Sequence, residues 1–278
     1  MKNLSTSALS PLPFQELRFL VLACFLALGL GACASSGPPR TATSTAADAD
    51  KVLLDGGNAA LASKKWSAAR QYFTKLLDSY PQSLYRADAK LGVGDSYLGE
   101  NTSASFVFAL NEFREFLSFY PTNPRADYAQ FQLATVHYKQ MLAPGRDQTE
   151  TKETVKEFQA FVDRYPNSTM MTDGRKRLRE AKDRLADYEY GIGMTYVHIR
   201  WYAGAVGRFK PLIEMDPGYT HKDAVYFYLA DALEKSNKAP EALPYYERLV
   251  KEFQTSQYLE ESRRRIELLK SSVLPEGL

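Results

Sequence analysis

Residues 109–121 read ALNEFREFLSFYP, and this stretch decides the fold. It places a small residue first, an aromatic residue four positions later and a proline eight positions after that. Four more copies of this order occur, with a weaker ending in the last two. The small residues are Ala69, Ala109, Thr154, Ala205 and Ala242, and the aromatic residues are Phe73, Phe113, Phe158, Phe209 and Tyr246. The copies end at Tyr80-Pro81, Tyr120-Pro121, Tyr165-Pro166, Asp216-Pro217 and Phe253-Gln254.

Each copy has the period of a helix. Apolar residues follow the small residue after four, seven and eight positions, so they share one helical face. Proline then ends the helix, because it lacks an N–H group and disfavours helical backbone in the residue before it. A glycine and an aromatic residue precede some copies at a fixed distance, as Gly193 and Tyr196 precede Ala205. The whole pattern resembles the helix pair of a tetratricopeptide repeat.

We therefore predict an all-α fold, an α-solenoid of five tetratricopeptide repeats with a C-terminal capping helix. No segment keeps the two-residue alternation of a strand. Repeats 1–3 are expected in residues 48–168, and repeats 4–5 with the capping helix in residues 169–278. The long helix 169–199 either couples these groups rigidly or is a hinge. The predicted helices are 48–62, 66–79, 84–99, 103–119, 124–142, 149–164, 169–199, 202–215, 220–236, 239–253 and, as the cap, 256–270.

The N-terminal residues predict export and lipidation. Basic residues precede an apolar run from Phe19 to Leu30, which is too short to span a bilayer of roughly 30 Å. The run leads into Leu-Gly-Ala-Cys at residues 30–33, which resembles the lipobox of bacterial lipoproteins. That resemblance implies that residues 1–32 are a signal peptide and that Cys33 carries a diacylglycerol and an N-acyl chain. The alternative is an ordinary signal peptide with a chance cysteine.

Residues 33–47 are expected to be the lipidated cysteine followed by a flexible tether. The segment after Cys33 contains no large apolar residue, so it cannot bury enough surface to offset the entropy of ordering.

Composition and motifs argue against several functions. The formal net charge of +2 gives no reason to expect nucleic-acid binding. The three histidines are far apart, and the sequence has no zinc-protease, serine-hydrolase or phosphate-loop motif. We therefore expect neither enzymatic activity, nor a bound metal, nor a cofactor other than the lipid.

Inward positions on the first helix of each pair offer a peptide groove. In tetratricopeptide proteins these helices line the concave face, and aromatic rings with a few polar groups suit an extended peptide. The alternative is that half of these side chains simply pack between adjacent helices. The candidate groove residues are Asn58, Asp95, Phe131, Thr135 and Tyr138.

Local strings, together with the lipobox and the repeats, identify a family resemblance. The chain resembles the BamD (ComL) family of outer-membrane assembly lipoproteins over nearly all of its mature length. Residues 170–174, MMTDG, depart from the family pattern. The strings that carry the resemblance are YPQSLY at 80–85, RYPNS at 164–168, RLADYE at 184–189 and WYAGAVGR at 201–208.

The resemblance implies a non-enzymatic scaffold, lipid-anchored in the outer membrane and facing the periplasm. Its implied partners are the POTRA domains of the insertase BamA, accessory Bam lipoproteins and unfolded outer-membrane β-barrel proteins. It places insertase docking in the C-terminal repeats, where we assign Trp201 and Arg208, and substrate recognition in repeats 1–3. Two alternatives share the anchor: a pilotin-type lipoprotein for secretin or pilus assembly, and a peptidoglycan-enzyme adaptor.

Overall fold

The computed structural model describes residues 48–273, and every regular element in that range is an α-helix. The all-α solenoid prediction is confirmed, and the signal peptide, Cys33 and the tether lie outside the described residues. Within residues 48–273, no helix is both long and apolar enough to cross a membrane. The helices are α2 (Ala49–Ala62), α3 (Trp66–Ser79), α4 (Arg86–Glu100), α5 (Ser103–Phe119), α6 (Ala126–Gln140), α7 (Thr149–Arg164), α8 (Met171–His198), α9 (Tyr202–Met215), α10 (Lys222–Lys235), α11 (Ala239–Glu252) and α12 (Leu259–Val273).

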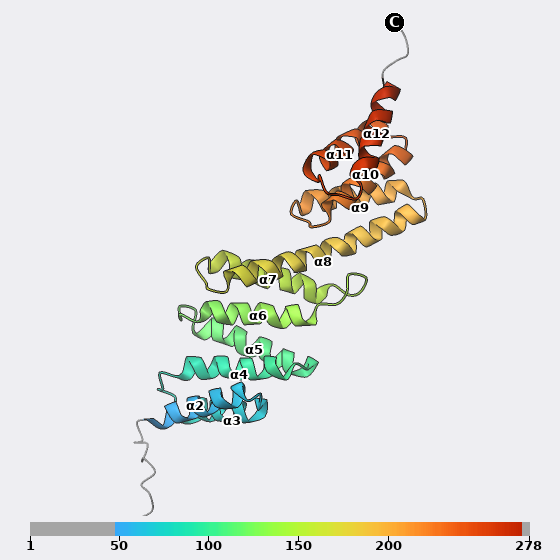
Figure 1. The fold of residues 1–278 in the computed structure, drawn as a ribbon. Helices are drawn as coiled ribbons and strands as arrows, with labels where there is room; N and C mark the ends of the chain where they lie inside the picture. The colour runs from blue at the N-terminus through green and yellow to red at the C-terminus, as the bar shows by residue number, and fades with distance from the viewer. Residues whose placement is uncertain (1–47, 274–278) are drawn as a thin grey trace, which may run out of the picture. The chain divides into compact units, whose positions relative to one another are not determined.

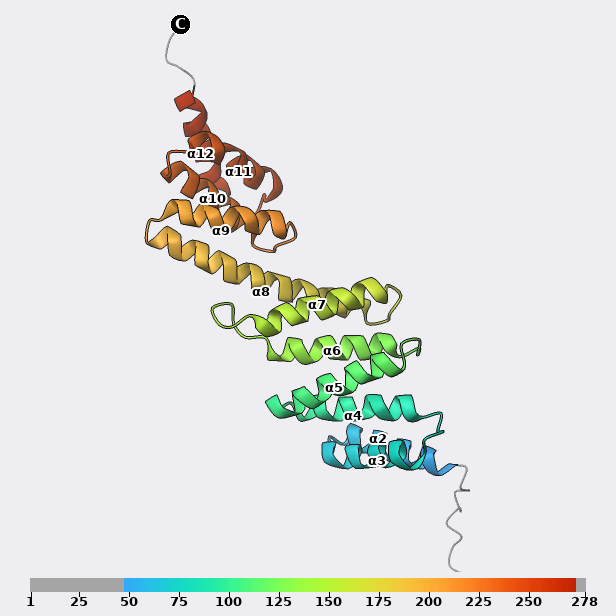
Figure 2. The same ribbon diagram turned by 180° about the vertical axis from the view of Figure 1, so that it is seen from behind.

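Successive helices pack on one another in chain order (Figure 1). The five pairs are α2–α3, α4–α5, α6–α7, α8–α9 and α10–α11, and α12 covers α11 as the predicted cap. The first helices of neighbouring pairs also touch, since α4 contacts α2 and α6, and α6 contacts α8. Figure 2 shows the same succession from behind.

Small residues lie opposite the aromatic residue of each repeat because its ring leaves no room for a larger side chain. The Phe73 ring is fully buried between α2 and α4, where it meets Gly57 and Gly92. A Cβ atom would lie 2.3 Å from the ring at Gly57 and 2.4 Å at Gly92, well inside contact distance. Only glycine therefore lets both helices approach this ring closely.

A serine and an aspartate repeat at the turns between pairs. Ser168, after Tyr165-Pro166, donates to Asp127 at 2.7 Å in the first turn of α6, and its hydroxyl accepts from the Met170 N–H. Ser256 does the same with Asp223 at 2.6 Å and with the Tyr258 N–H. This turn delays the capping helix, which begins at Leu259 and not at the predicted residue 256.

Helix α8 serves two pairs at once. Its first half packs on α7 through Leu178, and its second half pairs with α9, where Gly193 lies against the buried Phe209 ring. In the fourth repeat the corresponding aspartate is Asp183, in the middle of α8. It accepts hydrogen bonds from the Thr220 N–H and hydroxyl. The first helix of that repeat is therefore fused to a helix that covers the repeat before it.

Candidate functional site

One exposed stripe runs along α9 from Trp201 through Arg208 to Met215. Residues seven apart share a helical face, and these three are 55%, 43% (side chain) and 72% exposed. The Trp201 ring is held in place because it lies edge-on to Tyr196, with ring centres 4.7 Å apart, and covers Gly204. The stripe thus presents an aromatic ring, a cation and a flexible apolar side chain to solvent.

The Arg208 guanidinium interacts with two side chains of α8, Glu189 and Tyr196. The guanidinium lies 3.1 Å from the Glu189 carboxylate. A hydrogen bond with Tyr196 and then the charge of Glu189 raise the pKa of Arg208 above its ordinary value. Because this pair is exposed, it contributes little to stability and stays available to a partner.

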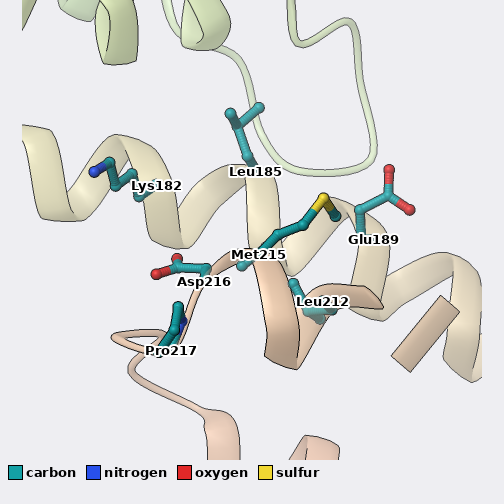
Figure 3. Close-up of a pocket in the computed structure, with 8 residues that line it drawn as sticks. Lys182, Leu185, Glu189, Leu212, Met215, Asp216 and Pro217 are labelled. Atoms are coloured by element: carbon teal, nitrogen blue, oxygen red, sulfur yellow. The ribbon is translucent and has the colours of Figure 1, made fainter. Parts of the chain in front are cut away.

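A pocket of about 370 Å³ opens beside the end of the stripe (Figure 3). It lies between the middle of α8, with Leu185 and Glu189, and the end of α9, with Leu212 and Met215. Met215 reaches across from α9 toward Glu189 (Figure 3). An apolar floor beside an exposed ion pair is the kind of surface that accepts an apolar anchor residue of a partner.

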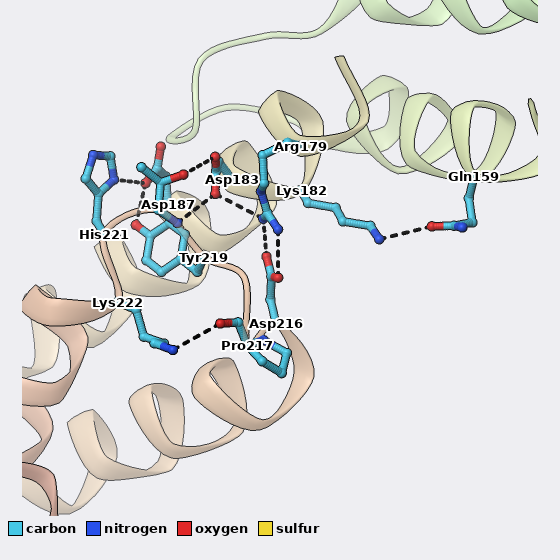
Figure 4. Close-up of polar contacts among 11 residues, drawn as sticks. Gln159, Arg179, Lys182, Asp183, Asp187, Asp216, Pro217, Tyr219, His221 and Lys222 are labelled. Atoms are coloured by element: carbon cyan, nitrogen blue, oxygen red, sulfur yellow. Dashed lines mark hydrogen bonds and ion pairs between the residues drawn. The ribbon is translucent and has the colours of Figure 1, made fainter. Parts of the chain in front are cut away.

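The turn between α9 and α10 braces the middle of α8 (Figure 4). Arg179 forms a two-point pair with Asp216, with one contact of 3.0 Å, and also lies 3.0 Å from Asp183. Asp183 in turn accepts bonds from the Thr220 N–H at 3.0 Å and its hydroxyl at 2.6 Å. Paired arginine–carboxylate contacts of this kind are geometrically restrictive, which favours a rigid α8 over a hinge.

Two contacts hold the other side of α8. Lys182 donates to the Gln159 side chain of α7 at 3.0 Å (Figure 4), and Arg184 donates to the Leu142 carbonyl at 2.9 Å. Helix α8, which pairs with α9, is therefore held by the third repeat as well as by the turn between α9 and α10.

Three of the predicted groove residues meet on α6, under the first half of α8. The Arg177 guanidinium lies 5.0 Å from the Phe131 ring centre and 5.3 Å from that of Tyr138. It also donates to the Thr135 hydroxyl at 3.0 Å, while the Tyr138 hydroxyl donates to Glu180 at 2.5 Å. Phe131 and Thr135 are buried, so a peptide would meet this cluster only at the rim formed by Tyr138 and Arg177.

Asp95 lies between α4 and α6, apart from that cluster. It accepts from the Tyr128 hydroxyl at 2.9 Å and from the Gln132 amide at 3.4 Å. Burial raises its pKa to about 6, against the opposing effects of these bonds and of Arg125. The remaining groove candidate, Asn58, is exposed on α2.

Two features of these surfaces were not predicted from the sequence. Met215 and Glu189 complete the α9 stripe and its pocket, and the seven-residue spacing from Trp201 and Arg208 would have indicated Met215. Arg177 carried no local signal, because it contacts α6 residues distant in sequence. Within residues 48–273 no group of three or more histidine, cysteine, aspartate or glutamate side chains is arranged to hold a metal ion.

Comparison with known proteins agrees with this architecture. A family model described as outer membrane lipoprotein (YfiO) matches residues 46–238, and a tetratricopeptide-repeat model matches residues 224–256. The TPR2AB domain of yeast Sti1 matches with 12% identity and a TM-score of 0.43 over 81% of this chain and 84% of that chain.

Two curated relatives are both named outer membrane protein assembly factor BamD. The protein from Caulobacter vibrioides is 31% identical over 195 residues, which cover 70% of this chain and 59% of that protein. The protein from Xylella fastidiosa is 23% identical over 175 residues, which cover 59% of each. The chain thus spans about 59% of the length of these relatives. Because the outer membrane lipoprotein model matches most of its length, this chain belongs to the YfiO family of outer membrane lipoproteins.

Proposed function

We propose that this protein is a non-enzymatic scaffold for assembling outer-membrane β-barrel proteins. Its family is that of outer membrane lipoproteins, and its relatives are named as outer membrane protein assembly factors. In this proposal Cys33 carries the lipid anchor, and the helical repeats face the periplasm. The anchor raises the effective concentration of any captured polypeptide beside the insertion machinery.

The α9 stripe carries the proposal for the insertase side. Trp201, Arg208 and Met215 combine residue types that are common in protein interfaces. Met215 and Glu189, the ion-pair partner of Arg208, also line the pocket. We assign this surface to the POTRA domains of the insertase BamA. The same machine would include accessory lipoproteins, for which no residue is assigned.

The substrate side is assigned to the first-helix face of repeats 1–3. What supports this assignment is that Asn58 is on α2, Asp95 on α4 and the α6 cluster on α6, the first helices of these three repeats, and that Tyr138 with Arg177 is the accessible part of the cluster. Unfolded β-barrel chains would bind there as extended segments, with rings supplying contact area and polar groups pairing with backbone.

A charge reversal on α9 tests the insertase assignment. Arg208→Glu places a second carboxylate beside Glu189 and removes the cation from the stripe, so less insertase should copurify with the detergent-extracted protein. Lys210→Glu, an equal charge change at another exposed position of the same helix, is the control and should retain the insertase. Equal recovery of the insertase with both variants would remove Arg208 from the docking surface.

A further inference from the structure

Among residues 48–271, four arginines each lie over an aromatic ring and pair with a carboxylate at the same time. The guanidinium carbons lie between 4.5 and 5.3 Å from the ring centres, within the range of cation–π attraction. In each set, the ring and the cation come from different helices or from a helix and the turn before it. The sets are Arg70 with Tyr97 and Glu100, Arg125 with Tyr128 and Asp88, Arg177 with Phe131, Tyr138 and Asp173, and Arg248 with Tyr226 and Glu252.

A fifth group of rings and carboxylates has no arginine. Tyr190 of α8, Tyr228 of α10 and Tyr258 before α12 form a row, with ring centres 6.3 Å and 5.7 Å apart, and all three are half-buried. Asp187 and Asp223 flank this row. Burial, then the neighbouring Tyr258 and Tyr228, and then the negative charges of Asp223 and Asp187 raise the pKa of Tyr190. We call these five residues the tyrosine patch.

The carboxylates of the tyrosine patch have hydroxyl partners in place of cationic ones. Asp187 accepts from the Tyr219 hydroxyl at 2.5 Å, and the exposed His221 ring lies 3.6 Å away (Figure 4). Asp223 accepts from the Ser256 hydroxyl at 2.6 Å. Among the side chains described in residues 48–271, no arginine or lysine forms an ion pair with either carboxylate or a cation–π contact with any of the three rings.

We infer that the tyrosine patch binds an arginine side chain from an extended segment of another protein. The patch crosses α8, α10 and the turn before α12, which suits an extended chain lying over them. A guanidinium stacks on a ring through its face and bonds a carboxylate through its edge, so it complements both halves of the patch. The patch lies apart from the α9 stripe and from the α6 cluster, so this inference stands whether or not the proposed function holds.

Peptide binding to the full-length protein in detergent tests the inference. The probe is a short fluorescent peptide that alternates arginine and serine, and its counterpart replaces every arginine with citrulline, which keeps the shape and removes the charge. Two variants probe the patch: Asp187→Asn keeps an acceptor for Tyr219, and Tyr228→Leu removes a ring. Asp78→Asn, at an exposed position of α3, is the matched control.

We expect the arginine peptide to bind, the citrulline peptide to bind far more weakly, and each patch variant to lose about tenfold in affinity while the control loses none. Circular dichroism identifies a misfolded variant, and Asp187→Asn alone then decides, because it leaves every ring in place. Equal binding of both peptides, or unchanged affinity in Asp187→Asn, would overturn the inference. Binding of glycerophosphoethanolamine in place of the arginine peptide would also overturn it and would assign the patch to a lipid headgroup.

Discussion

Replacing Asp95 with asparagine should make the protein more stable at neutral pH and should change how its stability varies with pH. The folded protein holds the Asp95 pKa at about 6, above the ordinary value of 3.8, chiefly because the carboxyl is buried between α4 and α6. Each pKa unit is worth about 1.4 kcal/mol, so ionised Asp95 costs the folded state about 3 kcal/mol relative to the unfolded chain.

The sign follows from the direction of the shift. A carboxyl whose pKa is higher in the folded state binds its proton more tightly there, so this site favours folding below about pH 4. That contribution is lost as the pH rises toward about 6 and beyond. Asparagine cannot ionise, and its oxygen can still accept from the Tyr128 hydroxyl.

Urea unfolding followed by the helical circular dichroism signal measures the effect. The free-energy difference between Asp95→Asn and the natural protein should increase by about 3 kcal/mol from about pH 4 to about pH 7.5. Comparing the two pH values removes any constant cost of the altered hydrogen bonds. Asp88→Asn on the same helix, which breaks an exposed pair with Arg125, should shift stability by less than about 1 kcal/mol. Parallel pH profiles for Asp95→Asn and the natural protein would refute the reasoning.

Three further outcomes follow from packing, bracing and lipidation. Phe209→Ala should cost about 3–5 kcal/mol, because it empties the space against Gly193, whereas Phe119→Ala at a 69% exposed position should cost far less; similar urea midpoints would contradict the packing account. Arg179→Ala should speed hydrogen exchange at the Thr220 N–H by freeing the α9–α10 turn from α8, and unchanged protection there would argue against the brace. Cys33→Ser should yield an unlipidated precursor that fails to reach the outer membrane, and normal processing would reject the lipobox interpretation.

Much of the fold could be predicted from the sequence because its signals are local. The spacing of Ala109, Phe113 and Pro121 depends only on the helical period and on the missing N–H of proline. The repeat then fixes which helix packs on which, since a pair that cannot bury its apolar stripe alone must stack on its neighbour. The start of α12 was missed because the Ser256 turn depends on Asp223, a distant residue.

The candidate sites were harder to predict because they depend on contacts between distant segments. Phe131 and Thr135 have the spacing of groove residues, yet they are buried. Arg177 packs against them from α8, a helix that begins only after the α6–α7 pair ends. Asp95 was singled out as an inward position, but its raised pKa comes from its burial between two helices. The α9 stripe was only partly identified: the seven-residue spacing from Trp201 and Arg208 indicates Met215, but the pocket beside Met215 depends on the packing of α8 against α9.

The central claim is that the α9 face of this repeat stack docks the barrel insertase, and crosslinking in living cells tests it most directly. A photoreactive residue in place of Met215, which is 72% exposed beside the pocket, should form an adduct with the insertase. The same residue in place of Phe119, which is 69% exposed on α5, should not. An insertase adduct from Phe119 alone, or a secretin or a peptidoglycan enzyme captured at Met215, would contradict the account.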